Sequence, residues 1–348
     1  MAALGLLSSL RGILQDKKNA DIESVLSKIN YKVTSTFMIT FCLLVTTNSL
    51  VGDPVSCFGD STHPKYKDNI VNLYCWTHST FTQSTLNGIS APYSGLSNHK
   101  YSDDVIYHTY YKWIPFILFI QGLLFYMPHF IWKKWEGGRI EKMINPHLPI
   151  IAQEERKKQL KELATYIKTS RSTNQIYAIK FLICDVLYIL NIIINIIMTD
   201  KVLNGNFISY GKNVLVYYNS ENKTSLNNPM HVIFPKITKC DLKLFGVSGT
   251  IEKHDFLCIL SLNDIYDKLY IVLWFWFWLL CVMNIIVFIY HIFLFIIPKY
   301  RRCLFGHLNI DKKTLNIFDG YGDAFLIYLL LRNFDNQSMK LLIEELQV

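Results

Sequence analysis

Four long stretches of the chain are apolar at nearly every position, and polar segments separate them. They occupy residues 33–52, 113–132, 176–198 and 270–297. The first is rich in threonine but free of charge ("VTSTFMITFCLLVTTNSLV"), and the last opens with "YIVLWFWFWLL". About 20 mostly apolar residues cross a bilayer as a helix, whereas helices of a soluble core keep a polar face. The pattern therefore predicts an all-α membrane protein built on a bundle of four transmembrane helices.

The segments between the spans fall into two classes by their content of lysine and arginine. Residues 1–32 hold five basic and three acidic side chains, 133–175 hold ten and five, and 298–348 hold seven and six. Residues 53–112 hold four basic and five acidic side chains, and 199–269 hold eight and seven. Because basic residues collect on the cytosolic side of a membrane, both termini and the middle loop are predicted to be cytosolic. Residues 53–112 and 199–269 are then the two extracellular loops.

This topology also accounts for the formal net charge of +8. The excess lies in the cytosolic segments, beside anionic headgroups, so lipids rather than nucleic acid are the expected partner of that charge. We expect residues 150–175 and the carboxyl-terminal region to form a cytosolic helical domain.

Four of the eight cysteines fall in the extracellular loops, as two pairs with equal spacing. Cys57 and Cys75 are eighteen positions apart, and so are Cys240 and Cys258. Disulfides persist in an oxidising compartment, whereas a zinc site would need a C-x2-C or Cys/His cluster, which neither loop has. The sequence therefore predicts two disulfides and no metal, and it leaves all three connectivities open. The sequon at Asn222 is a glycosylation candidate on the same side.

Polar residues within the spans are candidates for pore lining or for structural contacts. At 100° per residue, Thr36, Thr40 and Thr47 lie within about 40° of one another on the first span. A threonine face suits a water-filled pore, although threonine hydroxyls also bond to backbone carbonyls in packed helices. Asp185, in the third span, is expected to face other helices in a structural role, and His291 is expected to be packed.

Two further local features carry predictions. Pro115 and Pro128 lie in the second span, where proline removes a backbone hydrogen bond and kinks a helix. The β-branched and aromatic run "NVLVYY" (Asn213–Tyr218) favours a strand, so the outer loops are expected to build a small α/β domain.

The stretch "YYKWIPFILFIQGLLFYMPHFIWKKWEGG" (Tyr110–Gly138) resembles the family-defining segment of the innexins, the gap-junction proteins of invertebrates. "GDPVSC", "YCWTHSTFT", "FPKITKC", "GVSGTIEKHDFLCILSLN" and "GDAFLIYLLLRNFD" follow the family's order around it. The resemblance covers about Gly52 to Asp335. Insect-associated viruses carry shortened relatives, and these motifs are compatible with either source.

The resemblance implies a large-pore channel of the plasma membrane. Family members form rings, described as octameric, of like or mixed subunits, and two rings dock head to head at a gap junction and pass ions and small metabolites. Their amino-terminal segment folds into the pore mouth with the first span. Pore-lining candidates are therefore Leu4, Leu7 and Arg11, with Thr36, Thr40 and Thr47. For the cysteines we adopt the loop-to-loop pairing Cys57–Cys258 and Cys75–Cys240 as the expectation.

Other functions find less support. The chain has no P-loop, HExxH or GxSxG motif, so no catalytic residue or cofactor is expected. A secondary transporter usually shows repeated spans with broken helices, which are absent here. A four-span adhesion protein without a pore shares the topology and disulfides, and it stays open as the alternative.

Overall fold

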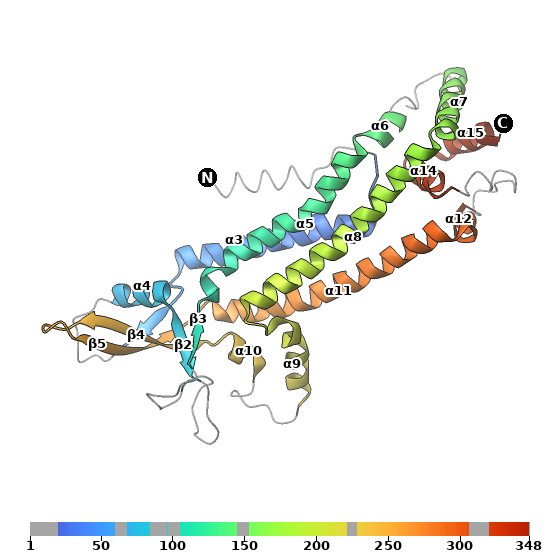
Figure 1. Cartoon of the computed structure of the whole chain (residues 1–348). Helices are drawn as coiled ribbons and strands as arrows, with labels where there is room; N and C mark the ends of the chain where they lie inside the picture. Colours follow the sequence, from blue (N-terminus) through green and yellow to red (C-terminus); the bar gives the residue numbers. More distant parts are fainter. Residues whose placement is uncertain are drawn as a thin grey trace. The chain divides into compact units, whose positions relative to one another are not determined.

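The computed structural model describes residues 20–59, 68–83, 96, 105–144, 153–220, 228–305 and 320–347. Within these ranges, four helices are long and apolar enough to cross a membrane. They are Val25–Val51 (α2, Val25–Lys28; a π-helical stretch, Ile29–Thr34; α3, Ser35–Val51), α5 (Ile114–Glu136), α8 (Arg171–Val202) and α11 (Asn263–Ile296). Figure 1 shows them as the four longest rods. The four-helix membrane architecture predicted from the sequence is confirmed.

These helices extend beyond the apolar spans because polar turns continue them at their ends. The first begins at Val25, well before residue 33, and Ser24 caps it by accepting a hydrogen bond from the Ser27 N–H at 3.0 Å. A serine at this position satisfies one of the free N–H groups of the first turn. The last begins at Asn263 rather than at residue 270.

Large apolar side chains remain exposed along the spans. On α11 they recur every seven residues, at Val272, Leu279, Ile286 and Phe293, which are 48–56% exposed. A soluble protein rarely exposes such a continuous apolar stripe, so it is suited to lipid or to a neighbouring subunit.

The chain divides into two compact units, and each is described by itself. The helical unit comprises Met1–Thr36, Gly122–Ile192 and Leu280–Val348, and the sheet unit comprises Phe37–Gln121 and Ile193–Leu279.

The helical unit contains a small domain around one apolar core. Its elements are α6 (Arg139–Ile144), α7 (Gln153–Thr169), α12 (Pro298–Phe305), α14 (Tyr321–Leu331) and α15 (Asn336–Gln347). Leu160 of α7, Leu326 of α14 and Leu342 of α15 are fully buried in the same cluster. The expected helical domain of residues 150–175 and the tail therefore exists. Helix α14 is apolar but too short to span, and it lies in this core.

The sheet unit holds five antiparallel strands in the order β1-β5-β4-β2-β3. The strands are β1 (Ser56–Phe58), β2 (Thr80–Gln83), β3 (Val105–His108), β4 (Ile237–Phe245) and β5 (Ile251–Ile259). The helices of the two loops are α4 (Asp68–His78), a 3-10 turn (Tyr110–Lys112), α9 (Phe207–Asn219) and α10 (Pro229–Ile233). Both predicted extracellular loops contribute strands to this one sheet, and α4 lies beside it (Figure 1).

One local prediction was wrong. "NVLVYY" lies in helix α9, not in a strand. Residues Phe207, Tyr210, Gly211 and Val214 are its buried positions, which is the i, i+3, i+4, i+7 spacing of a helix face. A short apolar run alone does not distinguish a strand from a buried helix. The preceding "FISYG" extends the run with apolar positions at helical spacing, which indicates a helix.

Candidate functional site

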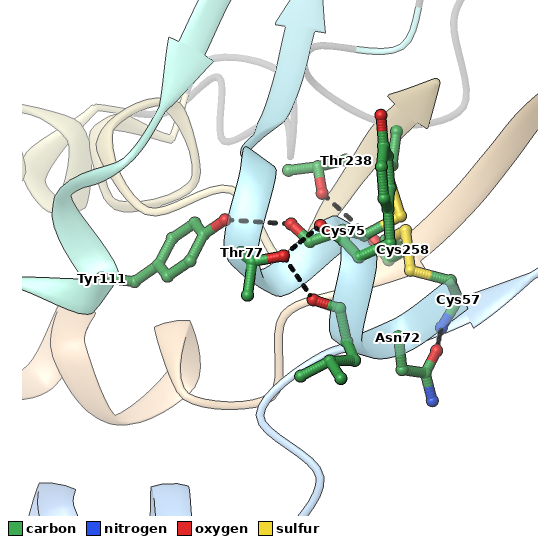
Figure 2. Close-up of a disulfide and its surroundings, with 10 residues drawn as sticks. Cys57, Asn72, Cys75, Thr77, Tyr111, Thr238 and Cys258 are labelled. Atoms are coloured by element: carbon green, nitrogen blue, oxygen red, sulfur yellow. Dashed lines mark hydrogen bonds between the residues drawn. A yellow bond between two sulfur atoms is a disulfide. The ribbon is translucent and has the colours of Figure 1, made fainter. Parts of the chain in front are cut away.

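The first disulfide joins the two predicted extracellular loops across the sheet. Cys57 on β1 is the register partner of Cys258 on β5, and their sulfurs are bonded. The Cys57 N–H donates to the Asn72 side-chain oxygen of α4 at 2.8 Å, so the helix holds the strand beside the bond (Figure 2). This connection spans 201 residues of sequence.

The second disulfide ties helix α4 to the sheet. Cys75 of α4 is bonded to Cys240 of β4, across 165 residues. Tyr111 donates its hydroxyl to the Cys75 carbonyl at 3.4 Å, and Thr238 donates to the Cys258 carbonyl at 3.5 Å (Figure 2). The structure thus pairs the cysteines between the loops, not within them.

The sulfurs of Cys57, Cys75 and Cys258 lie within 4.8 Å of one another. Zinc binds thiolates, and these sulfurs are all in disulfides. Their closeness is explained by the two adjacent bonds and does not indicate a metal site.

Beyond the disulfides, strands β4 and β5 continue as a hairpin. Its turn passes through Gly246 and Gly249, and Gly249 has a φ of 78°, which side chains other than glycine rarely adopt. The "FGVSGT" turn between two alternating runs was the sequence signal for this hairpin, and our sequence reasoning missed it. At its tip Phe245, Val247 and Ile251 are strongly exposed.

The threonine face of the first span remains open in the single chain. Thr40 and Thr47 are exposed and Thr36 is half-buried, and all three follow one stripe of α3 with the exposed Leu44. The Thr47 hydroxyl donates to the Leu43 carbonyl at 2.8 Å, the bonding that lets threonine sit in an apolar helix.

Polar residues inside the helical unit are paired between helices. The carboxylate of Asp185 on α8 is hydrogen-bonded to His291 on α11, with 2.6 Å between Oδ2 and Nδ1. Asn30 donates to the Asn284 side-chain oxygen at 2.9 Å. Asp185 and His291 were each candidates from the sequence, but a pairing across 106 residues leaves no local signal. An intramembrane carboxyl group needs such a partner because hydrocarbon supplies none.

The segment before the first span is held by the carboxyl-terminal region. Arg332 forms an ion pair with Asp21 at 2.5 Å, and Asn333 accepts from the Asp21 N–H at 2.6 Å. Glu23 pairs with His129 of α5 at 2.6 Å. These contacts hold residues 21–23, just before the first span, in place.

Burial shifts the pKa values of two titratable groups of the sheet unit, His108 and Asp241. Burial lowers the pKa of His108 on β3 from 6.5 to about 4, and its Nε2 lies 2.8 Å from the Thr82 hydroxyl. Burial, followed by the charge of Asp255, raises the pKa of Asp241. Each shift disfavours the charged form.

The other candidate site residues lie partly outside and partly inside the described ranges. Leu4, Leu7, Arg11 and Asn222 lie outside the described residues. Pro128 lies inside α5, as expected. For Pro115 the expected kink is wrong: it is the second residue of α5, where proline removes no intrahelical hydrogen bond.

Comparisons with known proteins agree with this architecture. The Innexin family model matches residues 23–347. Innexin inx2 of Drosophila melanogaster is 35% identical, over 98% of this chain and 94% of its own length. Innexin inx2 of Schistocerca americana is 34% identical over 98% and 96%, and innexin inx3 of Drosophila melanogaster 33% identical over 99% and 90%. This chain therefore belongs to the innexins, and it is a subunit of a gap-junction channel in the plasma membrane.

Proposed function

We propose that this chain forms a ring, octameric by analogy with its family, that docks head to head with a ring of the adjoining cell. The resulting conduit passes ions and small metabolites. Both termini and the helical unit's small domain face the cytosol, and the sheet unit's strands face outward. The observation that carries the proposal is the set of exposed stripes on the four spans, which a single chain leaves uncovered.

The pore is lined by α3 together with the amino-terminal segment. Thr36, Thr40 and Thr47 supply hydroxyls on one stripe of the helix, and the exposure of Thr40 and Thr47 leaves that stripe free to face water. Polar side chains on one face of each lining helix keep a wide pore wetted. The contacts of Asp21 and Glu23 support a fixed departure point for the segment that carries Leu4, Leu7 and Arg11.

The outer surface is made rigid by the two disulfides. The two bonds are nested: in the chain-entropy view the first closes a loop of well over a hundred residues and stabilises the folded state by about 5 kcal/mol, and the second, which then closes a much shorter loop, adds about 4 kcal/mol. A rigid rim docks with less loss of conformational freedom than two separate loops would. The disulfides thus serve docking as well as folding.

Junctional conductance between two cells tests the proposal directly. Cells lacking other innexins would be paired with the chain expressed in both partners or in one only. We expect conductance and transfer of a small dye only when both cells express it. Adhesion at cell contacts without conductance would favour the adhesive alternative.

The pore-lining assignment has its own test. Thr40→Cys should be modified by a hydrophilic thiol reagent through the open channel, changing its conductance. Cys42, Cys184, Cys281 and Cys303 are replaced by serine in the background, so that the introduced thiol is the one outside the two disulfides. The matched control is Val45→Cys, because Val45 is fully buried on the same helix. Equal protection of Thr40→Cys and Val45→Cys in conducting channels would contradict the assignment.

A further inference from the structure

One face of the β4–β5 hairpin carries an ordered pattern of charge. Side chains of a strand alternate between faces, so the odd-numbered residues of β4 and β5 lie together. On this face the register places Asp241 opposite Asp255, and Lys243 opposite Lys253. Asp255, Lys243 and Lys253 are exposed and Asp241 is half-buried. A row of two acids is thus followed by a row of two lysines.

Within one chain this arrangement is unfavourable. Like charges directly opposite on neighbouring strands destabilise a hairpin. The raised pKa of Asp241 reflects the same crowding, in addition to burial. The adjacent lysine row, about 7 Å along the strands, offsets only part of this repulsion. A partner that brings lysines to the acids and acids to the lysines would relieve both rows.

The rows on either side follow the same symmetry. Toward the tip the next pair is Phe245 and Ile251, and toward the base it is Lys239 and Leu257. A two-fold axis between the acid row and the lysine row exchanges these two rows as well. Ile251, 61% exposed, then meets Leu257, 42% exposed, and Phe245, 82% exposed, meets the half-buried Lys239. The face is therefore complementary to itself in charge, and Ile251 and Leu257 add an apolar contact.

We propose that this face, the docking stripe (Leu257, Asp241, Asp255, Lys243, Lys253, Phe245 and Ile251), pairs with the same stripe of a second copy in the opposing ring. The inference rests on the proposed head-to-head docking and assigns the residues that make it selective. Two identical rings meeting face to face are related by two-fold axes, which require a self-complementary contact.

Symmetry favours the opposing ring over a neighbour within one ring. Ring neighbours contact each other through two different surfaces, so a self-complementary face gives no advantage there. The hairpin is also available: among the described residues, 241–245 and 251–256 form ladder pairs only with each other. Repetition around the ring multiplies a modest contact into firm attachment.

Charge variants in paired cells test the stripe. The plus variant is D241K/D255K, the minus variant is K243E/K253E, and the swap variant combines all four changes. Plus–plus and minus–minus pairs place like charges together, so we expect at least a tenfold loss of junctional conductance. Plus–minus pairs should recover at least half of the wild-type conductance. The swap variant should couple with itself but at least tenfold less with the wild type.

Controls separate docking from folding. Surface labelling and non-reducing disulfide mapping check that each variant reaches the membrane with Cys57–Cys258 and Cys75–Cys240 intact. E252K changes charge on the opposite face of the hairpin, where Glu252 is exposed, and should leave coupling within twofold. Should a lysine or glutamate variant fail to reach the surface, D241N/D255N and K243Q/K253Q replace it. We expect each neutral variant to lose coupling severalfold.

The outcomes are distinct. Variants that reach the surface and couple with the wild type like E252K would overturn the stripe while leaving the channel function intact. Failure of every combination, including plus–minus and swap–swap, would also overturn it, because complementarity would then not decide coupling. Absence of conductance between wild-type pairs would overturn the proposed docking and this inference with it.

Discussion

The sheet unit and the small helical domain are stabilised in different ways. The sheet joins segments far apart in sequence through two disulfides, and it exposes charged and apolar side chains on its hairpin. The helical domain has no disulfide among its described residues and relies on a buried apolar cluster around Leu326. A domain cross-linked by disulfides can remain folded while it exposes apolar and like-charged side chains to a partner. A domain held together by packing alone has to bury its apolar residues. This difference predicts opposite sensitivities of the two regions.

The largest effect is expected from removing a disulfide. Cys57→Ser or Cys240→Ser, with the other disulfide intact, should destabilise the sheet by about 4 kcal/mol and abolish intercellular coupling. Hydrogen exchange of purified protein would show loss of protection in β4 and β5, with the helical domain unchanged. Cys281→Ser is the control, since Cys281 forms no disulfide. Normal junctional conductance with Cys57→Ser or Cys240→Ser would contradict the role of the disulfides in docking.

A smaller loss is expected from the helical core. Leu326→Ala deletes a fully buried side chain and should cost about 3 kcal/mol in that domain. Tyr328→Ala on the same helix is the comparison, because Tyr328 is 38% exposed. Exchange protection of α14 and α15 should fall for the first variant only, and reducing agent should not change the result. A reductant-sensitive α14 would erase the contrast between the regions.

Acid should affect the sheet through His108. Its pKa is lowered on folding, so its neutral form stabilises the fold above about pH 6.5, and that contribution is lost as pH falls toward 4. At pH 5 the loss amounts to about 2 kcal/mol. Exchange protection of β2 and β3 should therefore drop between pH 7 and pH 5. In His108→Gln the drop should disappear, and an unchanged drop would assign it to another group.

The smallest effect is a gain in stability. Asp241→Asn removes the repulsion with Asp255 and should stabilise the isolated hairpin by about 0.5 kcal/mol. The raised pKa of Asp241 has the same sign, because protonation favours the folded hairpin as pH falls. The variant should nevertheless couple more weakly, since it removes charge from the docking stripe. A variant with a more stable hairpin and higher junctional conductance would contradict the proposal that these charges destabilise the hairpin but favour docking.

The sequence predicted what depends on local pattern. Apolar length located the four spans, helical periodicity identified the Thr40 and Thr47 stripe, and compartment reasoning identified the disulfide-forming cysteines. Helix ends were misplaced because caps such as Ser24 lie outside the apolar runs. Residues brought together from distant segments were not predicted: neither the Asp185–His291 pair nor the Asp21–Arg332 pair leaves a local signal. The strand predicted at Asn213–Tyr218 was wrong because intrinsic β-propensity has less influence than the helical spacing of buried positions along Phe207–Asn219.

We propose that the disulfide-linked sheet lies outside the cell and the helical domain inside. Intact single cells would be treated with a membrane-impermeant amine reagent, and the protein then digested without reduction for mass spectrometry. We predict modification of the exposed Lys243 and Lys253, no modification of Lys157 and Lys158 on α7, which are also exposed, and peptides linked as Cys57–Cys258 and Cys75–Cys240. Modification of the α7 lysines in intact cells, with the hairpin lysines reached only after permeabilisation, would contradict it.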